Sequence, residues 1–393
     1  MLFRSVLHVV KKPSPGERER SPALDLLKIV ACVLVVVIHT TASGVTGYLP
    51  GSWLQRLAIG INSVSQFAVP AFIFASGFGL AARYRGKERV DGLLGFWGRR
   101  IETVLLPYLI WSLIYLILQQ RFMGICYGAA GMVKLILNGG AFYHLYFMVI
   151  LIQLYLVFPL LLALRRRFGG GLWRPGGDRG SKGPKGSLGS HGSFGSRGLW
   201  GERGLGDEAR PEGARGVVFS LDIAIVAVLY LLYAFWLRRY VPFSDRFFMT
   251  YLPFFYAGMV TFERPPRATL LTVFGIAGAV AFADYLVGRL ALYRSITPMT
   301  MLSMPLAWEI YSLSIVMLLL AWFKAININE KLGGWVSRLS GVTFDVYLAH
   351  PLILFFVSRW SQAINLQSLT LEIVLGFVLG LALPALVRLG YNG

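Results

Sequence analysis

The sequence has little charge and almost no cysteine. Only 15% of its 393 residues are charged, well below the roughly 25% of ordinary soluble domains. Its mean hydropathy is +0.62 and 56% of its residues are hydrophobic. The two cysteines, Cys32 and Cys126, lie in or beside apolar runs and are too few for a disulfide framework or a zinc cluster. These scarcities exclude a soluble enzyme and a disulfide-stapled secreted domain, and they predict an integral membrane protein.

Long apolar runs recur along the whole chain. Because about 20 apolar residues cross the hydrocarbon core of a bilayer, we expect an all-α, polytopic helical bundle with ten transmembrane helices. The first run is longer than the core of a secretory signal and lacks a small-residue cleavage site, which favours a retained first span. The expected spans are residues 24–42, 58–82, 101–119, 144–164, 217–237, 247–262, 268–287, 302–323, 342–358 and 369–388.

Positive charge is concentrated in particular loops between these spans. The chain has 38 Lys and Arg against 19 Asp and Glu, a net charge of +19. When the N-terminus is placed in the cytoplasm, most basic residues fall on the cytoplasmic side, as the positive-inside rule requires. We therefore predict a multi-pass protein of the plasma membrane with both termini cytoplasmic. This distribution also favours membrane lipids, and not nucleic acid, as the partner of the basic residues.

A stretch without apolar periodicity separates two membrane halves. Residues 165–216 are rich in Gly, Ser and Arg, so they cannot bury enough surface to offset the entropy of ordering. Their composition favours a flexible linker, with binding of anionic headgroups as the alternative. The predicted organisation is a cytoplasmic tail (1–22), a first membrane half with the active-site helices (23–164), this cytoplasmic loop (165–216) and a second membrane half (217–393).

The first span, ALDLLKIVACVLVVVIHTT, carries polar side chains on one stripe. At 3.6 residues per turn, Asp25, Lys28, Cys32 and His39 share a helix face, and the eleven residues from Lys28 to His39 make about three turns. Ionisable groups cost on the order of 2.5–3.5 kcal/mol each at the centre of a membrane helix, so the stripe predicts a hydrated interior. Asp25 and Lys28 are explained equally well by their place at the span's end, where a lysine reaches the interface.

Three of the five histidines lie in or at predicted spans. They are His39, His144 and His350, whereas His8 and His191 fall in the tail and the loop. A single histidine in a membrane helix is compatible with a packing hydrogen bond, but three favour a lined polar cavity. Imidazole, with an unperturbed pKa of about 6.5, also suits proton transfer at neutral pH.

Five stretches, in order along the chain, resemble the acyltransferase family 3 membrane proteins. They are LDLLKIVACVLVVVIHT, FAVPAFIFASGF, RRIETVLLPYLIW, YHLYFMVILIQLYLVFPLL and LSGVTFDVYLAHPLILF. Members of this family transfer acyl groups, usually acetyl, onto glycans and other hydroxyl acceptors at the cell envelope. The amino-acid sequences of the second and fourth stretches most resemble the branch of the family that acts on surface polysaccharides such as poly-N-acetylglucosamine.

The family's first-span signature is a basic residue, ten intervening residues and a histidine. The resemblance places these roles on Lys28 and His39. The family more often has arginine at the first position, and lysine keeps the charge but loses the planar bidentate fork. Where many members carry a further basic residue this chain has Thr103, which leaves Arg99 and Arg100 as the cation pair. Inner-face arginines are also compatible with a purely topological role.

The resemblance implies an O-acetyltransferase that takes acetyl-CoA, or another acyl-CoA, from the cytoplasm. The acceptor would be an extracytoplasmic glycan or another hydroxyl compound, and no metal cofactor is expected. His39 would act as a general base or would itself take the acyl group, and the sequence leaves both open. The predicted site comprises His39 and Lys28 as catalytic residues, Lys28, Arg99 and Arg100 as donor-binding residues, and Asp25, His144 and His350 as supporting residues.

The polar side chains in the predicted spans are also compatible with other functions. A stripe of ionisable side chains through ten helices also fits a proton-coupled transporter or a polysaccharide exporter. The sequence has no obvious pair of glycine-interrupted half-helices in matching positions of two inverted halves, which weakens that alternative. A subunit that passes acyl groups to a partner protein and a homo-oligomer are both compatible with the sequence.

Overall fold

The computed structural model of the protein is a bundle of long helices. It describes residues 21–84, 93–169, 220–263, 265–292 and 303–392, and these residues form helices, turns and connections but no strand. The all-α polytopic fold expected from the sequence is confirmed. His8 and His191, with most of the predicted tail and loop, lie outside the described residues.

The helices follow the predicted spans closely. In the first half they are α2 (Pro22–Gly47), α3 (Trp53–Ser65), α4 (Ala68–Tyr84), α5 (Leu93–Arg100), the π-helical segment η1 (Ile101–Leu105), α6 (Leu106–Met123), the short α7 (Ala129–Leu137) and α8 (Tyr146–Phe168). In the second half they are α9 (Leu221–Leu232), η3 (Tyr233–Leu237), η4 (Arg238–Tyr240), η5 (Ser244–Arg246), α10 (Phe248–Glu263), α11 (Ala268–Leu292), α12 (Ser303–Ala325), α13 (Glu330–Ala363) and α14 (Leu369–Asn392).

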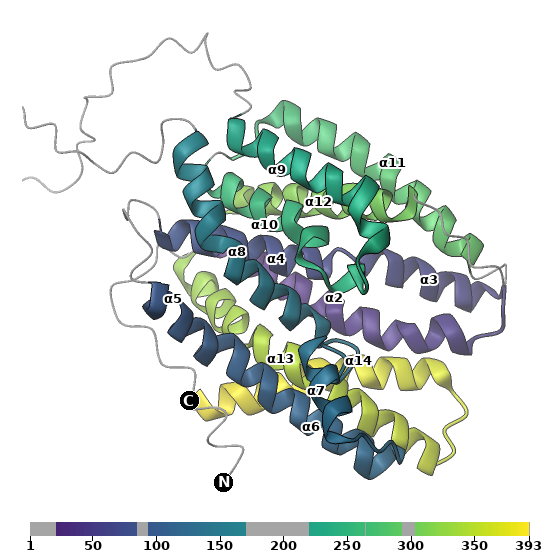
Figure 1. The fold of residues 1–393 in the computed structure, drawn as a ribbon. Coiled ribbons are helices and arrows are strands. Elements are labelled where there is room, and N and C mark those ends of the chain that lie inside the picture. Colours follow the sequence, from purple (N-terminus) through teal and green to yellow (C-terminus); the bar gives the residue numbers. More distant parts are fainter. Residues whose placement is uncertain (1–20, 85–92, 170–219, 264, 293–302, 393) are drawn as a thin grey trace, which may run out of the picture.

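Nine membrane crossings in the described ranges are long and apolar enough by composition. The sixth expected span is present as α10, a shorter helix of 16 residues. Helix α7 was not expected from the sequence, and α8 extends through Phe168 into the start of the predicted loop. Ten alternating crossings would place the start of α2 and the end of α14 on one face, and Figure 1 shows the C-terminal end of α14 on the same side as α5.

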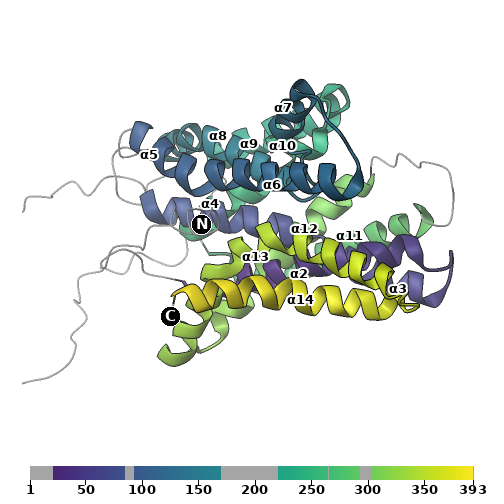
Figure 2. The same ribbon diagram turned by 90° about the horizontal axis from the view of Figure 1, so that it is seen from below.

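Helix α2 occupies the middle of one helix group and packs on α3, α4, α12, α13 and α14. Helix α13 runs parallel to it, because Asp25 meets Ser340 and, further along both helices, His39 meets His350. Helix α14 runs antiparallel, since the hydroxyl of Tyr48 at the far end of α2 lies 2.8 Å from the first-turn Thr370 hydroxyl of α14. Figure 2 shows α6, α8 and α10 on one side of α4, and α2, α13 and α14 on the other.

The second span, expected as one stretch over residues 58–82, consists of two helices. The chain breaks between α3 and α4, and Pro70 lies in the first turn of α4, where its missing N–H costs no helical hydrogen bond. Helix α12 binds two carbonyls freed by the break. Trp308 Nε1 donates to the Gln66 carbonyl at 3.4 Å, and the Tyr311 hydroxyl donates to the Val64 carbonyl at 2.7 Å. Non-helical backbone at membrane depth is stable only with such partners.

Buried charges join the end of α8 to the start of α9. Arg165 is fully buried and donates to Asp222 at 2.6 Å and to Glu263 at 2.8 Å. The Tyr256 hydroxyl also donates to Asp222. Removing one partner from such a buried cluster typically costs about 3–5 kcal/mol. The cluster therefore fixes α8, α9 and α10 together where the two predicted membrane halves meet.

Helices α4 and α10 touch backbone to backbone. A Cβ added to Gly77 would overlap the Phe255 carbonyl oxygen, and one added to Gly258 would overlap the Phe74 carbonyl oxygen. Small residues at such positions let membrane helices approach closely and gain dispersion contacts. Glycine is therefore required at both positions by close approach and not by backbone conformation.

We predict that Gly77→Ala lowers the stability of the protein by about 1–3 kcal/mol, because the added methyl group must push α10 away from α4. The measurement is the midpoint of thermal unfolding in detergent. Gly79→Ala, on the same helix, is the matched control because a Cβ there has no heavy atom within 4 Å. Equal unfolding midpoints for the two variants would show that the close contact between α4 and α10 does not contribute to stability.

Candidate active site

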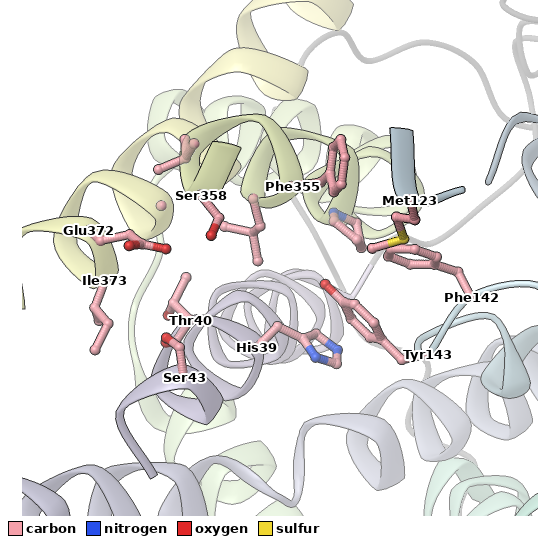
Figure 3. A pocket seen from close by; sticks show the side chains of 14 residues that line it. His39, Thr40, Ser43, Met123, Phe142, Tyr143, Phe355, Ser358, Glu372 and Ile373 are labelled. Carbon is pink, nitrogen blue, oxygen red and sulfur yellow. The ribbon is translucent and has the colours of Figure 1, made fainter. Parts of the chain in front are cut away.

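A cavity of about 230 Å³ lies beside the second half of α2. Its walls come from α2, α13, α14, the end of α6 and the loop that precedes α8. Figure 3 shows His39 and Tyr143 toward one end, and the Glu372 carboxylate on the same side as Thr40 and Ser43. The polar lining residues are His39, Thr40, Ser43, Tyr143, Ser358 and Glu372, and the others are Met123, Phe142, Pro351, Leu354, Phe355, Val357, Ile373 and Gly376.

The three predicted membrane histidines meet beside this cavity, and His39 is the one that lines it. The rings of His39 and His350 are stacked with centroids 5.3 Å apart and planes at 28°, and the rings of His350 and His144 meet edge-on at 5.5 Å. The His39 ring also lies 4.6 Å from the Tyr143 ring. Residues from both membrane halves therefore build one site. In the part of the chain that is described, no group of three or more His, Cys, Asp or Glu side chains is placed to hold a metal ion.

The hydrogen bonding of His350 fixes which ring nitrogen carries its hydrogen. Nδ1 lies 3.0 Å from the Val346 carbonyl, which can only accept, so Nδ1 is the donor in the neutral ring. Nε2 then presents a lone pair, and it has no hydrogen-bond partner among the described residues. Because leaving a buried polar group unpaired costs about 1–3 kcal/mol, such a ring is better explained by function than by packing.

His144 is buried and is held by its backbone. The Tyr347 hydroxyl of α13 donates to the His144 carbonyl, whereas neither ring nitrogen has a hydrogen-bond partner within the described ranges. The preceding loop is fixed as well, because Arg246 donates to the Asn138 carbonyl at 3.0 Å. Gly139 there has a φ of +71°, and a Cβ added to it would lie 2.6 Å from Tyr146 Cα, so only glycine fits this turn.

Asn62 of α3 holds helix α2 on the side away from α13, and it was not among the site residues predicted from the sequence. Asn62 Nδ2 donates to the Ile38 carbonyl at 2.8 Å and to the Thr41 hydroxyl at 3.0 Å. Arg289 of α11 donates to the Asn62 side-chain oxygen at 2.9 Å. These bonds bracket His39 and fix the rotation of α2. A lone asparagine in an apolar span was the signal available for finding it.

The predicted cation of the first span lies at the other end of the α2–α13 contact. Lys28 Nζ is 3.1 Å from the Asp25 carboxylate, which also accepts the Ser340 hydroxyl at 2.8 Å. Between this pair and His39, Cys32 Sγ donates to the Thr343 carbonyl of α13 at 3.6 Å. The stripe thus faces α13 along its length, and buried side chains of α2 and α13 fill its middle.

The predicted arginine pair contacts α4, α8 and its own helix. Arg99 donates to the Tyr84 hydroxyl at 3.3 Å. The Arg100 guanidinium lies over the Tyr155 ring of α8 at 4.8 Å and over the Phe96 ring at 5.4 Å. The aromatic faces stabilise these cations by cation–π attraction. Lys28 and the arginines are therefore positioned by different helices.

Comparison with known proteins adds one match. A family model described as an acyltransferase domain matches residues 21–174 and 212–389. The two matched segments contain His39, His144 and His350 as well as Lys28. No curated protein and no solved structure matches the chain.

We predict that His144→Phe raises or preserves the unfolding midpoint while it lowers activity. The replacement keeps an aromatic ring, slightly larger than imidazole, and removes two buried nitrogens that have no hydrogen-bond partner among the described residues, which relieves a cost of about 1–3 kcal/mol. Thermal unfolding in detergent and acyl transfer, measured on the same preparation, provide the two values. A large loss of stability would show instead that the ring nitrogens hold the fold together.

Proposed function

This chain belongs to acyltransferase family 3 and is a membrane acyltransferase, and we propose that it moves an acetyl group from acetyl-CoA to a hydroxyl of an envelope glycan. One observation carries the proposal. His39 forms part of the wall of a mainly apolar cavity that also has hydroxyl groups and one carboxylate in its walls, and the His350 imidazole stacks on the His39 ring. An imidazole placed in this way can take the proton of a hydroxyl group that enters the cavity.

The proposed reaction is a direct transfer. His39 accepts the proton of the acceptor hydroxyl, and the oxygen attacks the carbonyl carbon of the acyl thioester. The carbon–sulfur bond breaks with its electron pair on sulfur, and the coenzyme A thiolate receives the proton from His39. The products are the acyl ester of the acceptor and free coenzyme A, and general-base assistance of this kind contributes about 10²–10⁴ in rate.

The neighbours of His39 position it. His350 is anchored through Nδ1 to the Val346 carbonyl and stacks on the His39 ring, while Asn62 holds the adjacent turn of α2. A base that is oriented before substrate binds loses less entropy in the reaction. His144 and Asp25 act in support, His144 beside His350 and Asp25 beside Lys28.

The donor is proposed to bind at the Lys28 end. In the orientation that satisfies the positive-inside rule, this end faces the cytoplasm, where Lys28, Arg99 and Arg100 would hold the phosphates of coenzyme A. Eleven residues of helix separate Lys28 from His39, a rise of about 16 Å. Because Cys32 and Val36 fill the contact with α13, the pantetheine arm would enter beside this contact and not through it.

We predict that His39→Ala lowers acyl transfer by at least about 10²-fold, the lower end of the general-base contribution, while the unfolding midpoint stays near that of the parent protein. Release of coenzyme A and ester formation are followed in detergent. Thr46→Ala, an exposed change near the end of the same helix, is the control. Near-normal turnover of His39→Ala would remove His39 from the mechanism. An acyl label that stays on the denatured parent protein, but not on this variant, would replace the base mechanism by a covalent acyl-histidine.

We predict that Lys28→Ala raises the KM for acyl-CoA with a smaller change in kcat, because it removes a phosphate contact made equally before and during the reaction. Initial rates are measured over a range of donor concentrations at saturating acceptor. Lys331→Ala is the matched control, since Lys331 is an exposed lysine at the start of α13 on the same face. Equal donor KM values for the two variants would remove Lys28 from the donor site.

A further inference from the structure

We infer that the cavity beside His39 receives a single sugar-sized unit of the acceptor that carries no negative charge, and that Glu372 is the residue that sets this specificity. The inference rests on the proposed function, because it assigns the cavity to the acceptor. It goes further by naming the charge of the acceptor and the side chain that discriminates between acceptors of different charge.

The size of the cavity limits what it can hold. An apolar cavity of about 150 Å³ accommodates one benzene ring, so a volume of about 230 Å³ accommodates one six-membered ring with its substituents. Sites for larger ligands usually enclose about 300–1,000 Å³. The cavity therefore takes one unit of a glycan, with the rest of the acceptor outside it.

The chemistry of the walls fits a polyhydroxylated ring. The hydroxyls of Thr40 and Ser43 donate to backbone carbonyls of α2 and keep lone pairs that can accept from a ligand, whereas the Ser358 hydroxyl can donate and accept. Phe142 and Phe355 supply apolar faces on which the C–H face of a sugar can lie. A ligand with alternating hydroxyl edges and C–H faces uses both kinds of wall, whereas a purely aliphatic chain would offer no donors to the accepting oxygens of Thr40 and Ser43.

The charged side chain in the cavity wall is an acid. Glu372 is the acidic residue among the fourteen that line the cavity, and within the described residues none of these fourteen is Lys or Arg. Figure 3 shows its carboxylate beside Thr40 and Ser43, away from His39. A carboxylate in this place accepts hydrogen bonds from hydroxyl groups and attracts an ammonium group, but it repels a uronate, a phosphate or a sulfate.

The packing of α14 keeps Glu372 in place. Glu372 lies in the first turn of α14, where the helix dipole stabilises an ionised carboxylate. Two residues earlier, the Thr370 hydroxyl is 2.8 Å from the Tyr48 hydroxyl of α2. One turn later, a Cβ on Gly376 would lie 3.0 Å from Leu354 of α13 and 3.5 Å from Thr40. Helix α14 is thus fixed against α2 and α13 on both sides of Glu372.

The test compares three methyl glycosides of one hexose: the neutral sugar, its 2-amino derivative and its uronic acid. For the parent protein, we expect kcat/KM for the uronic acid to be at least about tenfold below that for the neutral sugar, a difference typical of one misplaced charge. The amino sugar should be accepted at least as well as the neutral one. Glu372→Gln keeps the size and the hydrogen bonding, so it should bring the three values to within about threefold of one another.

Glu330→Gln is the control, because Glu330 is an exposed acid in the first turn of α13, at the other end of that helix from the cavity. It should leave the three ratios unchanged. Ratios that are equal in the parent protein, or that Glu372→Gln does not alter, would overturn the inference. A change in unfolding midpoint without a change in ratio would leave Glu372 with a role in helix stability only and would also overturn it.

A binding measurement separates this inference from the proposed function. The affinities of the three glycosides for His39→Ala and for the His39→Ala, Glu372→Gln double variant are measured by calorimetry in detergent, without turnover. The expected order of affinity is amino, then neutral, then uronic, and Glu372→Gln removes that order. If this order is found but the parent protein never consumes acyl-CoA, the inference stands and the proposed donor fails. If acyl-CoA is consumed but no order is found, the inference alone fails.

Discussion

The parallel packing of α2 against α13 is the contact on which the whole site depends. It joins Asp25 to Ser340 at one end and His39 to His350 at the other. Parallel helices advance by the same rise per residue, and the contacts stay in register from Cys32 and Thr343 to His39 and His350, which is seven residues on each helix. The distance between the Lys28 end and the imidazole pair is therefore fixed by helix geometry, and α14 and the loop before α8 close the cavity around the second end.

A second constraint is that polar groups at membrane depth need partners. The structure meets it at two places that hold the fold together: α12 side chains bind the carbonyls freed at the α3–α4 break, and Arg165 donates to Asp222 and Glu263. At the histidine cluster the constraint is not met, since ring nitrogens of His144 and His350 have no hydrogen-bond partner among the described residues. Locally unfavourable groups of this kind are concentrated at functional sites. The histidine cluster is therefore a better candidate for the catalytic site than the ion cluster around Arg165.

The spans could be predicted because hydropathy depends on each segment alone, and the shared face of Asp25, Cys32 and His39 could be predicted because helical periodicity is local. The meeting of His39 with His144 and His350 was expected only because three histidines in or at predicted spans favour a lined polar cavity. Glu372 was missed because an acid at the start of a span has an ordinary explanation in the helix dipole. Its place in the cavity depends on the antiparallel packing of α14, which no local periodicity reveals. The two-helix form of the second span was missed for the same reason, since it requires the partners that α12 supplies.

The distribution of charge along α2 gives the site a direction. Lys28 lies at one end, and the arginine pair is predicted on the same side, whereas the cavity at the other end contains Glu372 and, among its described lining residues, no basic side chain. A polyanionic donor is attracted to the first end and repelled from the second. An acceptor without negative charge has no such penalty at the second end. Charge asymmetry alone would then keep coenzyme A from occupying the acceptor cavity, and it would let the two substrates approach His39 from opposite sides of the membrane without a gate that selects between them.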